Sequence, residues 1–180
     1  LNPVEGTRDL WVFDVKRTVS ERVTTNPGDD IAPVWSPTGD RLVYSSGRRG
    51  RSDLFQKPST SADGETLVPV TGLDVGKFAA DWSRDDVLVF IAGGRIIARS
   101  DLWLLPLAGD RRPVAFAESP AVETHARFSP DGKWVVYTSI DSGRFEVYVR
   151  PAIGDGPRER ISVNGGRYGL WRRDFTEVFF

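Results

Sequence analysis

Residues 128–149 read FSPDGKWVVYTSIDSGRFEVYV, and in this stretch short apolar runs alternate with turn residues. The Pro130-Asp131-Gly132 segment has turn chemistry, because proline fixes one φ and glycine is free to adopt a positive φ. The runs on either side of residues 141–143 are β-branched and aromatic and about five residues long, which is typical of buried strands. The stretch therefore predicts two short strands that follow an aromatic residue and a turn.

The same pattern recurs along the chain. Its leading aromatic, followed by a polar residue, stands at positions that are 47, 46 and 43 residues apart: Trp35, Trp82, Phe128 and Trp171. A second marker, an acidic residue before two apolar ones, recurs 44, 48 and 45 residues apart: Asp9, Asp53, Asp101 and Glu146. Two markers with one period indicate an internal repeat.

Each repeat is predicted to close with a further strand, at residues 20–24, 66–70, 113–116 and 159–163. No long window has a helical period, and 18 Gly and 12 Pro interrupt the chain too often for helices. Four short strands in about 45 residues are typical of a propeller blade. The expected fold is therefore all-β, a β-propeller with four antiparallel strands per blade.

We expect one domain over residues 1–180, with four blade equivalents. Three complete blades are predicted at residues 30–72, 73–118 and 119–163, and half blades at residues 1–29 and 164–180. The first half supplies strands three and four, the second half strands one and two, so the two could join as a fourth blade. Alternatively, the chain is a fragment of a larger propeller that associates with itself through its open edges. Both readings stay open, because the matched half blades favour closure of the ring and the absence of Met favours the fragment.

Composition excludes several classes of partner. A formal net charge of −1 gives no electrostatic attraction to nucleic acid or to an anionic membrane surface. The longest apolar run, Val87–Ala92, is far shorter than the ~20 residues that span a bilayer. We therefore expect no nucleic-acid binding and no membrane insertion.

Candidate catalytic residues are few. His125 is the single histidine, and no Gly-x-Ser-x-Gly motif supplies a nucleophile for it. The chain has no cysteine, and it lacks an acidic array of the Asp-x-Asp-x-Asp type for calcium. We therefore expect a protein that is not an enzyme and that uses no cofactor and no metal.

Two sets of residues are candidates for a ligand or partner face. His125 lies three residues before Phe128, at the predicted start of an innermost strand near the central channel, and Tyr168 is at the equivalent position. The second set consists of arginines in the connections between strands two and three: Arg48, Arg49, Arg51, Arg95, Arg99 and Arg144. They are either solvated loop residues or a basic face for an anionic ligand or an acidic protein partner. The repeated aromatics, by contrast, are expected to pack between neighbouring sheets.

Residues 126–139 and 143–150 resemble the TolB-type repeat, a WD-like β-propeller family. Three further segments, 101–107, 149–151 and 166–174, are similar to the propellers that follow the kinase domain in bacterial serine/threonine kinases. The resemblance implies a sensory or protein-interaction module outside the cytoplasmic membrane, in the periplasm for TolB-like proteins. The second repeat departs from the pattern, because Arg84-Asp85-Asp86 replaces Pro-Asp-Gly and residues 93–100 lengthen a connection.

The function expected is a non-catalytic binding, sensory or protein-interaction module. One alternative is the accessory propeller of a prolyl-oligopeptidase-like hydrolase whose catalytic domain lies elsewhere. Another is a purely structural module that associates with itself.

Overall fold

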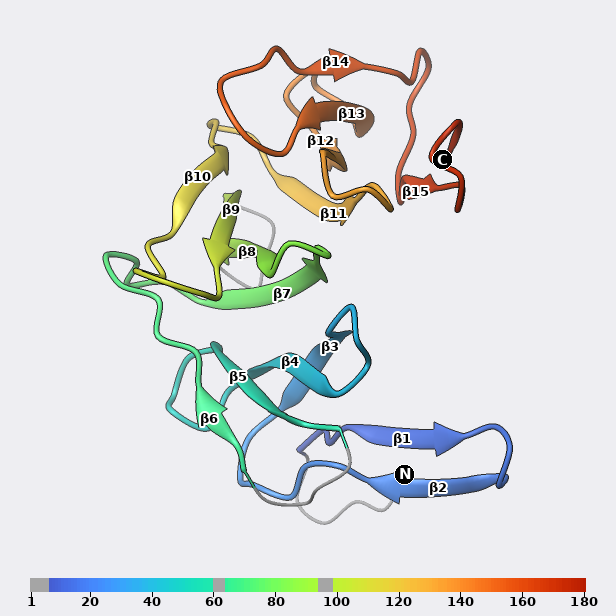
Figure 1. The fold of residues 1–180 in the computed structure, drawn as a ribbon. Coiled ribbons are helices and arrows are strands. Elements are labelled where there is room, and N and C mark those ends of the chain that lie inside the picture. The colour runs from blue at the N-terminus through green and yellow to red at the C-terminus, as the bar shows by residue number, and fades with distance from the viewer. Residues whose placement is uncertain (1–6, 60–63, 94–98) are drawn as a thin grey trace.

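The computed structural model describes residues 7–59, 64–93 and 99–180, which form sixteen strands. Figure 1 shows three four-stranded sheets that follow one another along an arc, with a two-stranded sheet at each end. Every strand within a sheet pairs antiparallel with the next strand of the chain. The prediction of an all-β chain with four-stranded antiparallel repeats is confirmed. No helix in the described part of the chain is long and apolar enough to span a membrane.

The three full sheets are numbered in chain order. The first contains β3 (Asp30–Trp35), β4 (Arg41–Ser46), β5 (Asp53–Pro58) and β6 (Thr66–Leu67). The second contains β7 (Lys77–Trp82), β8 (Val87–Gly93), β9 (Ser100–Pro106) and β10 (Val114–Ala117). The third contains β11 (Glu123–Phe128), β12 (Trp134–Ser139), β13 (Glu146–Pro151) and β14 (Glu159–Arg160). β6 and β14 are shorter than predicted, because these edge strands pair on one side only and their side chains are exposed.

The polar residue after each repeat aromatic closes a turn. The buried hydroxyls of Ser36, Ser83 and Ser129 accept hydrogen bonds from backbone N–H groups at the start of the following strand, at 3.0, 3.1 and 3.0 Å. This explains why a small hydroxyl residue follows the aromatic in three of the four repeats. The bond stabilises the turn that the Pro-Asp-Gly composition predicts.

The core lies between neighbouring sheets. β8 is apolar throughout because both of its faces are buried: Leu88 and Phe90 belong to the cluster shared with the first sheet, and Val89 to the cluster shared with the third. A cross-strand aromatic pair recurs at one register in every full sheet: Tyr44 with Phe55, Phe90 with Trp103, and Tyr137 with Tyr148. Burying one such side chain contributes about 1.5–3 kcal/mol.

The two end sheets stay apart. β1 (Trp11–Asp14) pairs with β2 (Val19–Arg22), and β15 (Leu170–Trp171) pairs with β16 (Val178–Phe179). Figure 1 shows these two sheets at opposite ends of the arc. The expectation that they join as one four-stranded blade is therefore wrong for this structure. Side-chain packing between neighbouring sheets sets the angle between each sheet and the next. These angles leave the β1–β2 sheet and the β15–β16 sheet apart.

The repeat aromatics are not equally buried. Trp82 and Phe128 are 5% and 8% exposed and belong to the cores between sheets, whereas Trp35 is 47% exposed. The guanidinium of Arg41, at the start of β4, covers the Trp82 ring at 5.0 Å. The sheet before Trp35, formed by β1 and β2, has no strand in the position of β4 among the described residues. Trp35 therefore lacks the neighbour that covers Trp82.

Candidate binding groove on the innermost strands

A bulge recurs in the innermost strand of each full sheet. The register shifts between Ile31 and Val34 in β3, between Ala79 and Asp81 in β7, and between Thr124 and Arg127 in β11. Bulges redirect the side chains beside them and are common near functional sites.

The backbone is unusual at these positions. Ala32, His125 and Tyr168 occupy the same place in three repeats, and their φ angles are +53°, +53° and +60°. A positive φ is uncommon for residues other than glycine and costs about 1–3 kcal/mol. The fold therefore holds His125 and Tyr168 in a conformation that the chain alone disfavours.

Hydrogen bonds between sheets hold the strands at this level. The N–H of Ala79 donates to the hydroxyl of Ser45 at 2.9 Å, and the N–H of Tyr168 donates to the hydroxyl of Thr138 at 3.3 Å. The first bond runs from β7 to β4, the second strand of the first sheet. The second bond runs from the segment just before β15 to β12, the second strand of the third sheet. The position of Tyr168 is thus tied to the packing of its segment against the third sheet.

The rings of His125 and Tyr168 lie edge to face with their centroids 4.1 Å apart. The Nδ1 atom of His125 is buried and has no hydrogen-bond partner among the described residues. Burial, and then the charges of Arg127 and Arg167, lower the pKa of His125 below its usual range. His125 is therefore neutral at pH 7.

These rings border a groove with a volume of about 400 Å³. Its lining combines apolar side chains with a few polar ones: Ile31, Phe78, Ile91, Ser100, Val122, Thr124, His125, Phe145, Arg167 and Tyr168. A second hollow of about 440 Å³ shares Ile31 and Phe78 with the groove and is bordered by Arg51 and several glycines. Apolar walls with a few polar groups are typical of binding sites.

The groove has the chemistry of a binding site. Nδ1 of His125 accepts no hydrogen bond from the described residues, so it is an acceptor open to a ligand. Within residues 7–59, 64–93 and 99–180, no group of three or more His, Asp or Glu side chains is arranged to hold a metal ion. Arg167 lies 3.5 Å from the centre of the Phe145 ring, which places a positive charge at an apolar wall.

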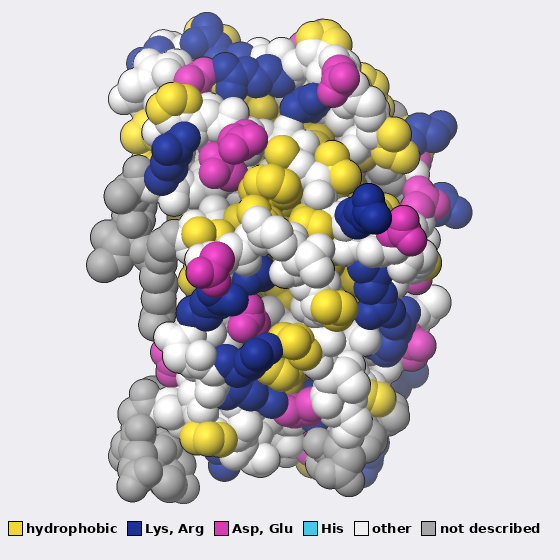
Figure 2. Space-filling model, turned by 90° about the vertical axis from the view of Figure 1, so that its left-hand side faces the viewer, with side chains coloured by type: hydrophobic (Ala, Val, Ile, Leu, Met, Phe, Trp, Pro, Cys, Tyr) yellow, Lys and Arg dark blue, Asp and Glu magenta, His cyan; other side chains and the backbone are white. Residues whose placement is uncertain are grey.

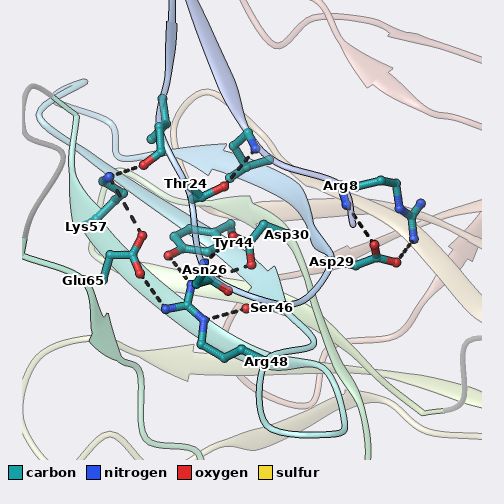
Figure 3. Close-up of polar contacts among 12 residues, drawn as sticks. Arg8, Thr24, Asn26, Asp29, Asp30, Tyr44, Ser46, Arg48, Lys57 and Glu65 are labelled. Carbon is teal, nitrogen blue, oxygen red and sulfur yellow. Dashed lines mark hydrogen bonds and ion pairs between the residues drawn. The ribbon is translucent and has the colours of Figure 1, made fainter. Parts of the chain in front are cut away.

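Of the predicted arginines, Arg48 points inward. Its guanidinium contacts Glu65 at 2.5 Å and the Tyr44 hydroxyl at 2.9 Å, and its Nε donates to the Ser46 hydroxyl at 2.8 Å (Figure 3). It also covers the Phe55 ring at 4.1 Å. Lys57, buried nearby, donates to the backbone carbonyl of Val23. Arg48 therefore holds the first sheet together and does not belong to an exposed basic face.

The remaining arginines differ among themselves. Arg51 pairs with Asp53 and Asp74, and Arg144 pairs with Glu146 at 2.7 Å. Arg49 and Arg99 are exposed, and Arg95 lies outside the described residues. Figure 2, which shows the side of the molecule that carries β6 and β10, has basic and acidic side chains interspersed. The structure thus brings His125 and Tyr168 together, and it places Arg48 among buried groups of the first sheet.

Sequence reasoning missed several residues of the groove. Ile31, Phe78, Thr124 and Arg167 all occupy the repeat position just before that of His125 and Tyr168. Alignment of the repeats contains this signal, because two neighbouring positions face the same groove in successive units. In β11 the register shift between Thr124 and Arg127 explains this for Thr124 and His125, since two adjacent residues of a regular strand would point to opposite faces.

No family model matches the chain. Over 119 residues it is 30% identical to the Tol-Pal system protein TolB of Bordetella pertussis, an overlap of 66% of this chain and 26% of that protein. The chain thus spans about a quarter of the length of the curated relatives it matches.

Solved structures share its fold. TolB from Acinetobacter baumannii superposes with a TM-score of 0.76 at 19% identity, over 94% of this chain and 42% of that one. A prolyl endopeptidase superposes with a TM-score of 0.62 at 15% identity, over 91% of this chain and 26% of the enzyme. Likeness at these identities shows the fold alone. Together with the curated relatives, it supports a TolB-like β-propeller family for this chain.

Proposed function

We propose that this TolB-like β-propeller chain is a non-catalytic binding module whose partner occupies the groove beside His125 and Tyr168. One observation carries the proposal: two polar aromatic side chains stand at the same repeat position, on backbone with positive φ, with their rings in contact at the groove. Backbone strain of this kind concentrates where a fold presents side chains to a ligand.

The lining indicates the chemistry of the partner. Phe78, Ile91 and Phe145 offer apolar contact, while Arg167 supplies a positive charge. A protein segment that carries an apolar side chain next to a carboxylate fits this combination, and a small anionic ligand fits it less completely. Protein-partner binding also agrees with the relatives, which are named as proteins of the Tol-Pal system.

Other functions rank lower. The accessory propeller of a hydrolase rests on the likeness to the prolyl endopeptidase, which concerns the fold only. A sensory role behind a kinase domain and self-association through open sheet edges are further proposals. The extracytoplasmic location that the resemblance implies is part of the leading proposal.

The groove is tested with peptides selected by display against the 180-residue chain. The best binder is then measured against the double variant His125→Ala/Tyr168→Ala. We expect an affinity loss of roughly tenfold or more, because two ring contacts at the groove are removed. The control is Trp11→Ala, which removes an exposed aromatic from β1 at the end of the arc and is expected to bind normally. Equal binding by the double variant would exclude the groove as the binding site.

A further inference from the structure

The sheet formed by β15 and β16 leaves a hollow of about 510 Å³ against the third sheet. The side chains around it come from both sheets and are mostly apolar or aromatic: Asp131, Trp134, Val149, Glu159, Ile161, Trp171, Phe175, Val178 and Phe180. Trp134, Phe175 and Phe180 are exposed to solvent. Exposed apolar walls of this kind indicate an interaction site.

The corresponding place between the first and second sheets is filled. By the strand pairings, the hollow's Ile161, Trp171 and Val178 stand at the repeat positions of Val68, Trp82 and Leu88, which belong to a buried core cluster. The third strand of the second sheet, β9, completes that cluster with Leu105 and Leu107. The β15–β16 sheet has no third strand among the described residues. The hollow is therefore the place that a third strand fills elsewhere in the molecule.

β1 carries the side chains that such a third strand needs. Counted from the acidic marker of each repeat, Trp11, Phe13 and Val15 stand at the positions of Trp103, Leu105 and Leu107. They alternate with Leu10 and Val12, which pack against the first sheet, so they lie on the opposite face. All three are exposed. The chain thus has an uncovered apolar row that matches the row buried in the second sheet.

The strand register gives a second match. In each full sheet an aromatic of the second strand pairs with an aromatic of the third, as Phe90 does with Trp103. Phe180 and Trp11 stand at these two positions in the end sheets, and both are exposed. Figure 1 shows the two end sheets at opposite ends of the arc, so the two residues of one chain do not meet.

We propose that β1 of a second copy of this chain pairs antiparallel with β16, so that the two end sheets form one four-stranded sheet between copies. In the register of the full sheets, Trp11 of the second copy lies opposite Phe180, and its Phe13 lies opposite Val178. The Phe13 and Val15 side chains of the second copy then occupy the hollow. Pairing also satisfies the backbone groups at two open strand edges. This interface is separate from the groove beside His125 and Tyr168, and the proposal does not rest on the proposed function.

Sedimentation velocity of the 180-residue chain over a range of concentrations tests the contact. We expect a mass of at least two chains that falls toward one chain on dilution. Phe13→Asp should weaken the association at least tenfold, because it places a charge in an apolar hollow. Ile153→Asp, at an exposed position after β13, is the matched control and should associate as the parent does. A parent that stays monomeric, or an association that Phe13→Asp leaves unchanged, would overturn the proposal.

Cysteine crosslinking tests the register, and the chain has no cysteine of its own. Residues directly opposite each other in an antiparallel pair have Cα atoms about 4.5–5.5 Å apart, which is within the range of a disulfide. A mixture of Trp11→Cys and Phe180→Cys chains should therefore form a disulfide-linked species of the two variants on oxidation. The control mixture is Trp11→Cys with Ile153→Cys. Equal crosslinking in both mixtures would mean random collision and would contradict the proposed pairing.

A variant that strengthens the contact keeps the proposal testable if Phe13→Asp does not fold. The same register places Glu177 opposite Asp14 of the second copy, and like charges opposite each other weaken a strand pair. Glu177→Gln removes this repulsion and should tighten the association by up to about fivefold. An association that is unchanged or weaker in Glu177→Gln would count against this register.

Discussion

The first and third sheets have the same strand register, yet they place opposite charges at two matching positions. Arg48 and Glu65 form the pair in the first sheet, and Asp141 and Arg158 form it in the third. In both, the pair links the segment after the second strand to the segment before the fourth. Both sheets thus place an ion pair here, with the cation on the segment after the second strand in the first sheet and on the segment before the fourth strand in the third.

Burial separates the two pairs as well. The side chains of Arg48 and Glu65 are 17% and 21% exposed, against 40% and 36% for Arg158 and Asp141. A partly buried pair loses less to solvent screening, and removal of one partner leaves the other uncompensated. The first sheet thus depends on its pair more strongly than the third does.

The largest difference between the two sheets is expected at their repeat aromatics. Phe128→Ala should lower the free energy of unfolding by about 3–5 kcal/mol, because Phe128 is buried between sheets. Trp35→Ala in the first sheet should cost less than about 1.5 kcal/mol, since its ring is about half exposed. Urea unfolding followed by circular dichroism measures both. Equal losses would mean that Trp35 is covered in solution.

The next largest effect concerns the two ion pairs. Arg48→Ala should cost about 3 kcal/mol, because it removes the cation beside Glu65 and Asp30 and leaves the hydroxyl of Tyr44 without its donor. Arg158→Ala should cost about 1 kcal/mol or less, as expected for an exposed pair. Differential scanning calorimetry of the two variants tests the ranking. A reversed order would show that the first sheet does not depend on its guanidinium.

A smaller effect follows from exchanging the charges of the first sheet to match the third. Arg48→Glu alone places two acids together and should be destabilising. Combined with Glu65→Arg, it should recover about 1–2 kcal/mol, since contacting residues couple in double-mutant cycles. The measured quantity is the coupling free energy from urea unfolding of the parent, both single variants and the double variant. A coupling free energy near zero would mean that residues 48 and 65 contribute to the free energy of unfolding independently of each other.

The smallest expected effect is a pH dependence within the third sheet. Burial raises the pKa of Glu123, whereas the hydrogen bond from Ser162 holds the pKa of Glu146 below its usual range. The contribution of Glu123 to stability is therefore full below the ordinary glutamate pKa and is lost as pH rises through the raised value. For Glu146 the sign is opposite, because its contribution is present above the ordinary pKa and is lost as pH falls through the lowered one.

Unfolding free energies of the parent, Glu123→Gln and Glu146→Gln from about pH 3 to pH 7 test these signs. In Glu123→Gln, the part of the unfolding free energy that declines as pH rises should be absent. In Glu146→Gln, the part that declines as pH falls should be absent. If both variants change the profile in the same direction, the environment of one of these carboxyls differs from that described.

Much of the fold was predictable because it depends on local patterns. The aromatic-serine step, the turn residues and the apolar runs all act within a few residues, so the strand order of each full sheet followed from them. The acidic markers revealed the repeat, and the structure adds that Asp9 pairs with Arg22 and Asp53 with Lys77. The inward placement of Arg48 could not be predicted, because its partner Glu65 lies 17 residues away in the chain.

The sequence by itself determined the repeat, the all-β architecture and the equivalent repeat positions of His125 and Tyr168. These depend on residue type and spacing, which local sterics and hydrogen bonding convert into strands and turns. Only the tertiary structure decided that Arg48 lies among buried groups of the first sheet, which repeat aromatic is covered, and that the end sheets stay apart. Each of these depends on packing between segments distant in sequence, and residue spacing does not specify that packing.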